Sequence, residues 1–180
     1  MLQITIPSVE LYDEISGEFI YTKEQTLQLE HSLVSLQKWE SKWHKPFLTK
    51  EAKTDEETID YIKCMTLTQN VNPVVYNFLT RDNIIQINKY IEDPMTATTF
   101  REETSQKGNR EVITAEIIYY WMFALNIPFE CRKWHLNQLL AQIRTCNIKN
   151  APPKKMSKSE IMRRNAALNE ARRKQLNTKG

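Results

Sequence analysis

Charge is unevenly distributed along this 180-residue chain, and this division limits how much of the chain can share one core. Residues 151–180 hold nine Lys or Arg and two Glu, out of chain totals of 25 basic and 22 acidic residues. Residues 1–150 therefore keep 16 basic and 20 acidic residues, so the net charge is −4 for this part and +7 for the C-terminal segment. We expect a globular domain over 1–150 and a basic tail over 151–180, joined at Pro152 and Pro153.

Hydrophobic periodicity predicts a mainly α fold for the globular part. The first long helix is expected over 23–44, because a capping-box spacing at Thr22 and Gln25 precedes an apolar stripe at helical spacing. That stripe consists of Leu29, Leu33, Leu36, Trp39 and Trp43.

Further helices are expected where apolar residues recur at helical spacing behind a capping residue. The predicted caps are Thr54, Asn72 and Asp82, and Pro73 stands at the first position of a short helix. Residues 114–126 are apolar nearly all round, which predicts a central core helix, and 130–146 predict an amphipathic helix packed on it.

The N-terminus has a different pattern. Leu2, Ile4 and Ile6 alternate with polar residues, and the extended stretch 18–21 follows a turn-prone segment at 13–17. This pattern predicts a short N-terminal β-hairpin. Residues 95–110 show no sustained periodicity, so we expect a mobile loop or at most a short strand there.

The basic tail carries its own helix signal. Ser157 and Glu160 have capping-box spacing, and the segment is expected to be helical to about Lys174. It has few apolar residues, with little beyond Ile161, Leu168 and Ala171 on one face. Because so little burial cannot offset about 1–2 kcal/mol of ordering entropy per residue, this helix is expected to order on contact with a partner.

No residue pattern points to an enzyme, a cofactor or a metal site. Only three Gly are present, which excludes Gly-rich phosphate-binding loops. Cys131 and His135 lie four residues apart, but no second pair stands at ligand spacing, so buried thiols are favoured over zinc. Helix capping explains the acidic residues at the start of the second helix better than acid–base catalysis does; these are Asp55, Glu56, Glu57 and Asp60.

The sequence contains no predicted membrane segment or secretion signal. Its most apolar run, residues 117–125, is nine residues long, whereas a membrane span needs about 20. Residues 1–7 have neither a basic start nor a continuous apolar stretch. We therefore expect a cytoplasmic protein with reduced cysteines.

Basic residues of the tail are the best candidates for partner binding. They spread around the helix, which argues against the reading of a base sequence. Docking to an acidic protein, nonspecific attraction to nucleic acid and a tail that is merely solvated remain the alternatives, in that order. Trp39 and Trp43 lie beside three lysines, but their helical spacing favours packing over base stacking. The predicted tail residues are Lys154, Lys155, Lys158, Arg163, Arg164, Arg172, Arg173 and Lys174.

Three blocks of sequence, at 27–43, 58–65 and 164–173, resemble the tail assembly chaperones of bacteriophages with long noncontractile tails. The likeness extends over most of the chain and lies in its overall sequence character. It includes no diagnostic motif. It implies a mostly helical, non-enzymatic protein of the host cytoplasm that binds the tape measure protein and the major tail protein and is absent from the finished virion. The resemblance implies no catalytic residues in this chain.

Two features fit this role. A tape measure helix exposes apolar stripes before the tail tube encloses it, and a chaperone needs an apolar groove and a charged arm to cover them. The stripe from Leu29 to Trp43 would supply the groove, and the tail the arm. The same stripe is also the expected core of the domain.

Two other functions remain open at this point. A small phage nucleic-acid-binding or regulatory protein would use the tail to neutralise phosphates, with binding that weakens steeply in salt. A structural connector of the virion would insert the tail into a neighbouring subunit and would be present in purified particles. A homo-oligomer is compatible with each of these functions.

Overall fold

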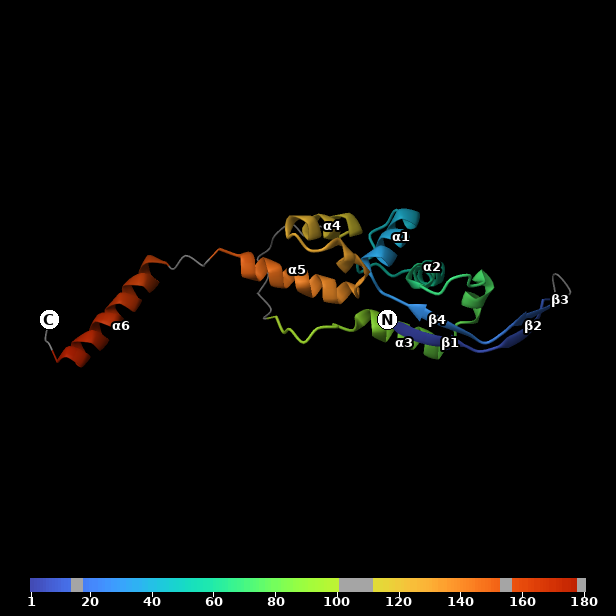
Figure 1. Cartoon of the computed structure of the whole chain (residues 1–180), viewed down its shortest axis with the longest axis horizontal. Helices are drawn as coiled ribbons and strands as arrows, with labels where there is room; N and C mark the ends of the chain where they lie inside the picture. Colours follow the sequence, from blue (N-terminus) through green and yellow to red (C-terminus); the bar gives the residue numbers. More distant parts are fainter. Residues whose placement is uncertain (14–17, 101–111, 153–156, 178–180) are drawn as a thin grey trace. The chain divides into compact units, whose positions relative to one another are not determined.

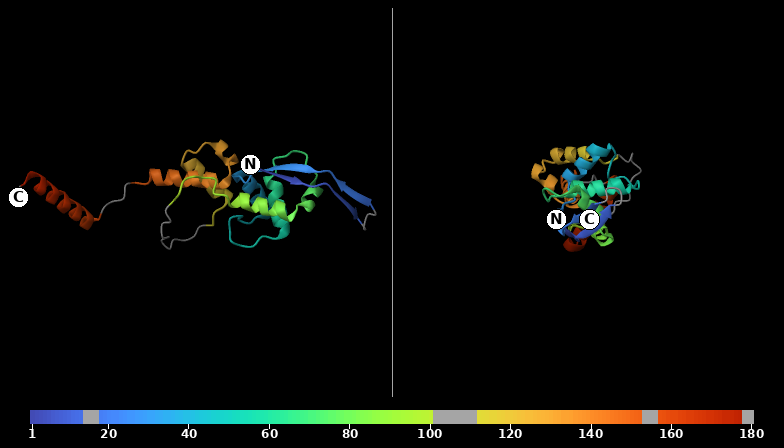
Figure 2. Two further views of the ribbon diagram at one scale, coloured as in Figure 1. Left: turned by 90° about the horizontal axis from the view of Figure 1, so that it is seen from below. Right: turned by 90° about the vertical axis from the view of Figure 1, so that its right-hand side faces the viewer.

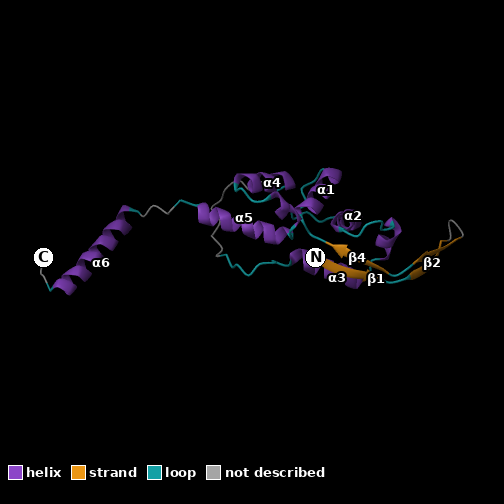
Figure 3. Ribbon diagram, viewed as in Figure 1, coloured by secondary structure: helices purple, strands orange, loops and turns teal. Residues whose placement is uncertain are grey.

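The computed structural model describes residues 1–13, 18–100, 112–152 and 157–177, and residues 11–13 and 18–20 by their backbone alone. The chain forms two compact units, Met1–Asn147 and Ile148–Gly180. Most of the described residues are helical, and the strands belong to an N-terminal hairpin (Figure 3). The predicted fold class, mainly α with an N-terminal hairpin and a C-terminal basic helix, is therefore confirmed.

The elements follow one another along the chain as coloured in Figure 1. Two 3₁₀ helices, η1 and η2, stand among the α-helices. The order is β1 (Leu2–Ile6), β2 (Val9–Asp13), β3 (Glu18–Thr22), β4 (Gln25–Leu29), α1 (Leu33–Trp43), α2 (Asp55–Met65), η1 (Pro73–Phe78), α3 (Arg81–Glu92), α4 (Ala115–Ala124), η2 (Phe129–Lys133), α5 (Leu136–Asn150) and α6 (Lys158–Leu176).

The hairpin is longer than the sequence pattern predicts. β1 pairs antiparallel with β4, from Leu2 opposite Leu29 to Ile6 opposite Gln25. β2 pairs with β3 in the same register, from Val9 opposite Thr22 onward. The predicted pairing of 2–6 with 18–21 is therefore wrong, since each has a different partner. The residues between β1 and β2 include Pro7, which has no N–H for the ladder. The predicted turn falls partly outside the described residues.

The predicted helix over 23–44 is wrong over its first ten residues, 23–32. Residues 25–29 form β4, because Leu27 and Leu29 alternate with polar residues and are buried opposite β1. The helix α1 starts only at Leu33, and its N-cap is Ser32, not Thr22. Ser32 and Ser35 form a capping box in which each hydroxyl accepts a backbone N–H.

Local capping signals elsewhere are mostly confirmed. Thr54 caps α2, and Asn72 caps η1 with Pro73 at its first position. Ser157 caps α6 through a capping box with Glu160. The prediction for Asp82 is wrong, because Thr80 caps α3 and Asp82 lies in the first turn.

The helices of the first unit pack around the β1–β4 half of the hairpin (Figures 1 and 2). α1 packs against α2, α4 and η2, while α3 packs against β1. One hydrophobic core joins them, and its largest side chains with almost no exposed surface are Trp39, Ile6, Leu27, Leu29, Leu33, Leu36, Ile62, Met65, Ile87, Ile118, Met122 and Leu136.

The segment 114–126 does not form a central helix. α4 buries Ala115, Ile118 and Met122, but Tyr120 is 68% exposed and Phe123 64% exposed. The helix therefore has one buried face and one exposed aromatic face, which an all-round apolar sequence does not distinguish. The predicted helix over 130–146 is shifted, since α5 begins at Leu136 and residues 129–133 form η2. Of the predicted loop, residues 95–100 contain no helix or strand; 101–110 lie outside the described residues.

Candidate interaction surfaces

The apolar stripe that was expected to form a groove lies in the core. Leu29, Leu33 and Leu36 have no exposed surface and Trp39 is 1% exposed. The Trp39 indole N–H also donates to the carbonyl of Glu57, 2.9 Å away. Only Trp43 at the end of the stripe is partly accessible. The alternative that the stripe is core is therefore the correct one, and α1 offers no open groove in this structure.

Two of the three lysines beside these tryptophans, Lys42 and Lys45, are held by acidic residues of α2. Lys42 forms an ion pair with Asp60, which also accepts the Trp43 indole N–H at 3.0 Å. Lys45 pairs with Glu57 at 2.6 Å. Burial opposes ionisation of Asp60, but the bonds from Lys42 and Trp43 outweigh it and hold its pKa below the ordinary value. These pairs join α1 and the residues just after it to α2, so the Lys42 and Lys45 ammonium groups are already neutralised by carboxylates.

Glu40 makes a second connection from α1. Its two carboxylate oxygens accept the backbone N–H groups of Phe47 and Ala115, each at 2.8 Å. Ala115 is the first residue of α4, whose N-cap, Thr114, makes no side-chain capping bond. The buried Glu40 carboxylate therefore supplies the acceptor and the negative charge that this helix N-terminus needs.

Two buried histidines lie in contact inside the first unit. The rings of His31 and His135 are 5.1 Å apart and nearly edge to face. His31 Nδ1 bonds the Tyr61 hydroxyl at 2.6 Å, and His135 Nε2 donates to the carbonyl of Tyr90 at 2.9 Å. Because both side chains are at most 5% exposed, no substrate reaches them.

The zinc hypothesis for Cys131 and His135 fails on the same geometry. Both ring nitrogens of His135 are already used, since Nδ1 accepts the backbone N–H of Asn137 at 3.3 Å. Cys131 lies in η2 and His135 lies just before α5, so they do not share a helix face. Within the described ranges, no group of three or more His, Cys, Asp or Glu residues is arranged to hold a metal ion.

The basic tail residues are exposed wherever the structure describes them. Every residue of α6 is exposed, and no side chain of this helix is buried. Lys174 pairs with Glu170 at 2.8 Å, an exposed contact that contributes little. Lys154 and Lys155 lie outside the described residues. The helix thus presents six basic residues to solvent: Lys158, Arg163, Arg164, Arg172, Arg173 and Lys174.

An exposed aromatic patch was missed by the sequence analysis. We define it as Tyr120 and Phe123 of α4 together with Phe129 of η2. The Phe123 and Phe129 rings stack with centroids 6.0 Å apart and planes at 15°, and the Arg132 guanidinium lies 4.1 Å over the Phe129 ring. All three side chains are at least 43% exposed. The signal that could have found it is the excess of aromatic residues in α4 over what one buried helix face can take.

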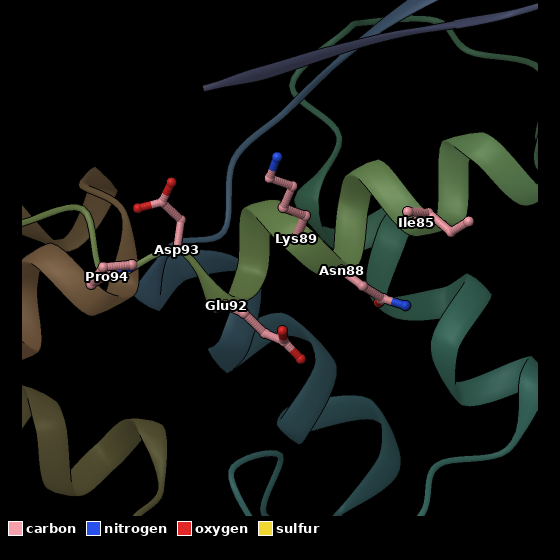
Figure 4. A pocket seen from close by; sticks show the side chains of 6 residues that line it. All are labelled: Ile85, Asn88, Lys89, Glu92, Asp93 and Pro94. Atoms are coloured by element: carbon pink, nitrogen blue, oxygen red, sulfur yellow. The ribbon is translucent and has the colours of Figure 1, made fainter.

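The hollow along α3 does not gather a reactive set of side chains. The hollow shown in Figure 4 lies along α3 and its C-terminal end. Lys89 and Asp93 point to one side of the helix there, whereas Asn88 and Glu92 point to the other. The lining residues thus do not converge on a common point where a substrate could react.

Comparisons of the chain with protein families, with curated protein sequences and with solved structures found no match. In the parts of the chain that the structure describes, no helix combines the length and the apolar character that crossing a bilayer requires.

Proposed function

We propose that this protein is a non-enzymatic assembly protein of a bacteriophage with a long noncontractile tail, and that it acts in the host cytoplasm as a tail assembly chaperone. Its partners in this proposal are the tape measure protein and the major tail protein. The observation that carries the proposal is α6, a 19-residue helix that is basic and buries none of its side chains.

A helix of this kind is suited to docking. It begins with a capping box, so its N-terminus is locally specified, but its exposed apolar residues give it no core of its own. Its positive charges are spread around the axis, which suits an acidic and variable surface better than a single groove. Burial against a partner would supply the stabilisation that the free helix lacks.

The aromatic patch supplies the apolar contact in place of the α1 stripe. Three large exposed rings on adjoining elements form a surface of the kind that covers apolar side chains of a partner. An apolar stripe on a tape measure helix fits this chemistry. The resemblance of residues 27–43, 58–65 and 164–173 to tail assembly chaperones supports the same choice of partner.

A pull-down from infected or co-expressing cells tests the proposal. The full chain, a chain ending at Asn150, and a Tyr120→Ser/Phe123→Ser variant are compared after nuclease treatment and at two salt concentrations. A matched control replaces two exposed apolar residues outside the patch, Leu67→Ser and Ile85→Ser. Both are exposed to a similar degree, at 54% and 55%.

We expect the full chain and the control to recover a long helical tail protein, and both the truncated chain and the patch variant to lose it. Recovery of nucleic acid alone, abolished by nuclease and by salt, would replace the proposal with the nucleic-acid-binding alternative. Presence of the protein in purified virions would favour the connector alternative.

A further inference from the structure

The outer half of the hairpin, formed by β2 and β3, is a two-stranded ribbon that the other elements of the described residues leave largely uncovered. β2 and β3 pack chiefly against each other, whereas β1 also packs against α3. Figures 1 and 2 both show this half of the hairpin reaching past the helices of its unit. Because an isolated two-stranded ribbon is only marginally stable in water, a partner that covers this ribbon would stabilise it.

The residue types of the ribbon are those of a contact surface. The register pairs Leu11 with Ile20 and Tyr12 with Phe19 on consecutive rungs. A ribbon with one solvated face would alternate between apolar and polar rungs, and this one does not. In the pair that precedes Leu11 and Ile20, Glu10 is opposite Tyr21, whose side chain is 63% exposed.

The charge of the ribbon indicates the sign of the charge that a partner would carry. Residues 8–24 contain five acidic residues and one lysine, a net charge of −4. Glu10 and Glu24 are exposed there. An anionic ribbon repels nucleic acid and anionic membranes, and two such ribbons repel each other edge to edge. Charge complementarity therefore favours a cationic protein segment as the partner.

The same chain carries a segment with the complementary properties. Residues 151–180 have a net charge of +7, and the described helix α6 exposes four apolar side chains between its basic residues. The sequences of the ribbon and of α6 thus both combine apolar residues with charge, and the two charges are of opposite sign. Each copy of the protein contains both partners.

We propose that the protein self-associates, with the basic C-terminal segment of one copy docked on the β2–β3 ribbon of a second copy. The contact joins two different surfaces. Two copies form a closed dimer if the tail of each docks on the ribbon of the other, and a longer assembly forms if each tail docks on a further copy. This inference does not rest on the proposed partners of the tail, because it concerns the free protein alone.

Sedimentation of the full chain with charge-reversed variants tests the inference. The ribbon variant is Glu10→Lys/Glu24→Lys, and the tail variant is Arg172→Glu/Arg173→Glu. The matched control is Glu51→Lys/Glu92→Lys, which changes the net charge by the same amount at exposed positions outside the ribbon. Far-UV circular dichroism establishes that each variant is folded as the parent is.

We expect the parent chain to associate in about 50 mM salt and to dissociate as salt is raised to about 300 mM, because screening weakens exposed charge pairs. Each of the ribbon and tail variants should weaken association by about tenfold or more, and combining them should restore it. The control should not weaken association.

A chain that stays monomeric at about 100 µM in low salt would overturn the inference. So would a control that weakens association as much as the ribbon variant, or a combined variant that shows no recovery. These outcomes leave the pull-down result unaffected, since that experiment tests a different partner.

Discussion

At the scale of single residues, the most unusual feature of the core is a pair of histidines in contact. Burial, with a smaller contribution from the neighbouring His135, lowers the pKa of His31 from 6.5 to about 3. Burial also lowers the pKa of His135. Both rings are therefore neutral in the folded protein near neutral pH, and their nitrogens serve as hydrogen-bonding groups.

These histidines predict a specific loss of stability in mild acid. Below pH 6.5 the unfolded chain binds a proton on His31, whereas the folded chain does so only near pH 3, so the free energy of unfolding falls as pH falls between these values. The expected loss is on the order of 1 kcal/mol for each pH unit below about 6.5. Urea unfolding at several pH values between about 7 and about 5 measures this loss. This range lies above the pH at which carboxylates titrate.

The control for this prediction is the variant His44→Gln, which changes an exposed residue at the end of α1. We expect the slope of stability against pH to be smaller in His31→Gln than in the parent, and to be unchanged in the control. An unchanged slope in His31→Gln would contradict a neutral, buried His31.

At the scale of elements, Glu40 joins three segments, and this connection can be tested. In Glu40→Gln, one carboxylate oxygen becomes an NH₂ group that faces a backbone N–H and cannot accept from it. We expect the free energy of unfolding to fall by about 1–3 kcal/mol, because one buried N–H loses its acceptor. Denaturant unfolding measures the change; Glu116→Gln, an exposed residue of α4, should change it by less than about 0.5 kcal/mol.

The sequence predicts those elements whose signals are local. The capping boxes at Thr54 and Ser157 involve residues three positions apart, and the structure confirms both. β4 was missed because Leu29 fits both a strand alternation and the helical stripe of α1, and only its pairing with β1 decides between them. Thr22 and Gln25 have the spacing of a capping box by coincidence, since Thr22 is the last residue of β3 and Gln25 the first of β4.

Only part of the candidate site could be predicted from the sequence, because local signals predict some of its residues and long-range contacts determine the others. The exposure of the α6 basic residues follows from the low apolar content of their own segment. By contrast, the burial of Leu33, Leu36 and Trp39 and the exposure of Tyr120 and Phe123 depend on which helices pack together. Those contacts join residues far apart in sequence, so periodicity within one helix does not contain them.

At the scale of the whole molecule, the two units make different contributions to stability. The core is formed by residues of the first unit, and all residues of α6 are exposed. Apolar burial is the main favourable contribution to folding, so the basic tail adds charge but little folding free energy. The tail also changes the sign of the net charge, which is +3 for the chain and −4 for residues 1–150.

Truncation after Asn150 is therefore expected to leave the free energy of unfolding within about 0.5 kcal/mol of the full chain. Urea unfolding of both chains at low protein concentration measures the difference. Near neutral pH the full chain should bind to a cation-exchange column, and the truncated chain should bind to an anion-exchange column. A loss of stability above about 1 kcal/mol would contradict the exposed state of α6.

The cap that Glu40 provides to α4 also bears on the order in which the protein folds. The two residues joined by this bond are 75 positions apart, and Thr114 offers no local substitute. Starting a helix is the costly step of helix formation, and a helix without a local cap must wait for long-range contacts to start it. α2 and α3 carry their own caps. We therefore expect α4 to form late, after α1 is in place, and Glu40 to have a low φ-value in folding kinetics.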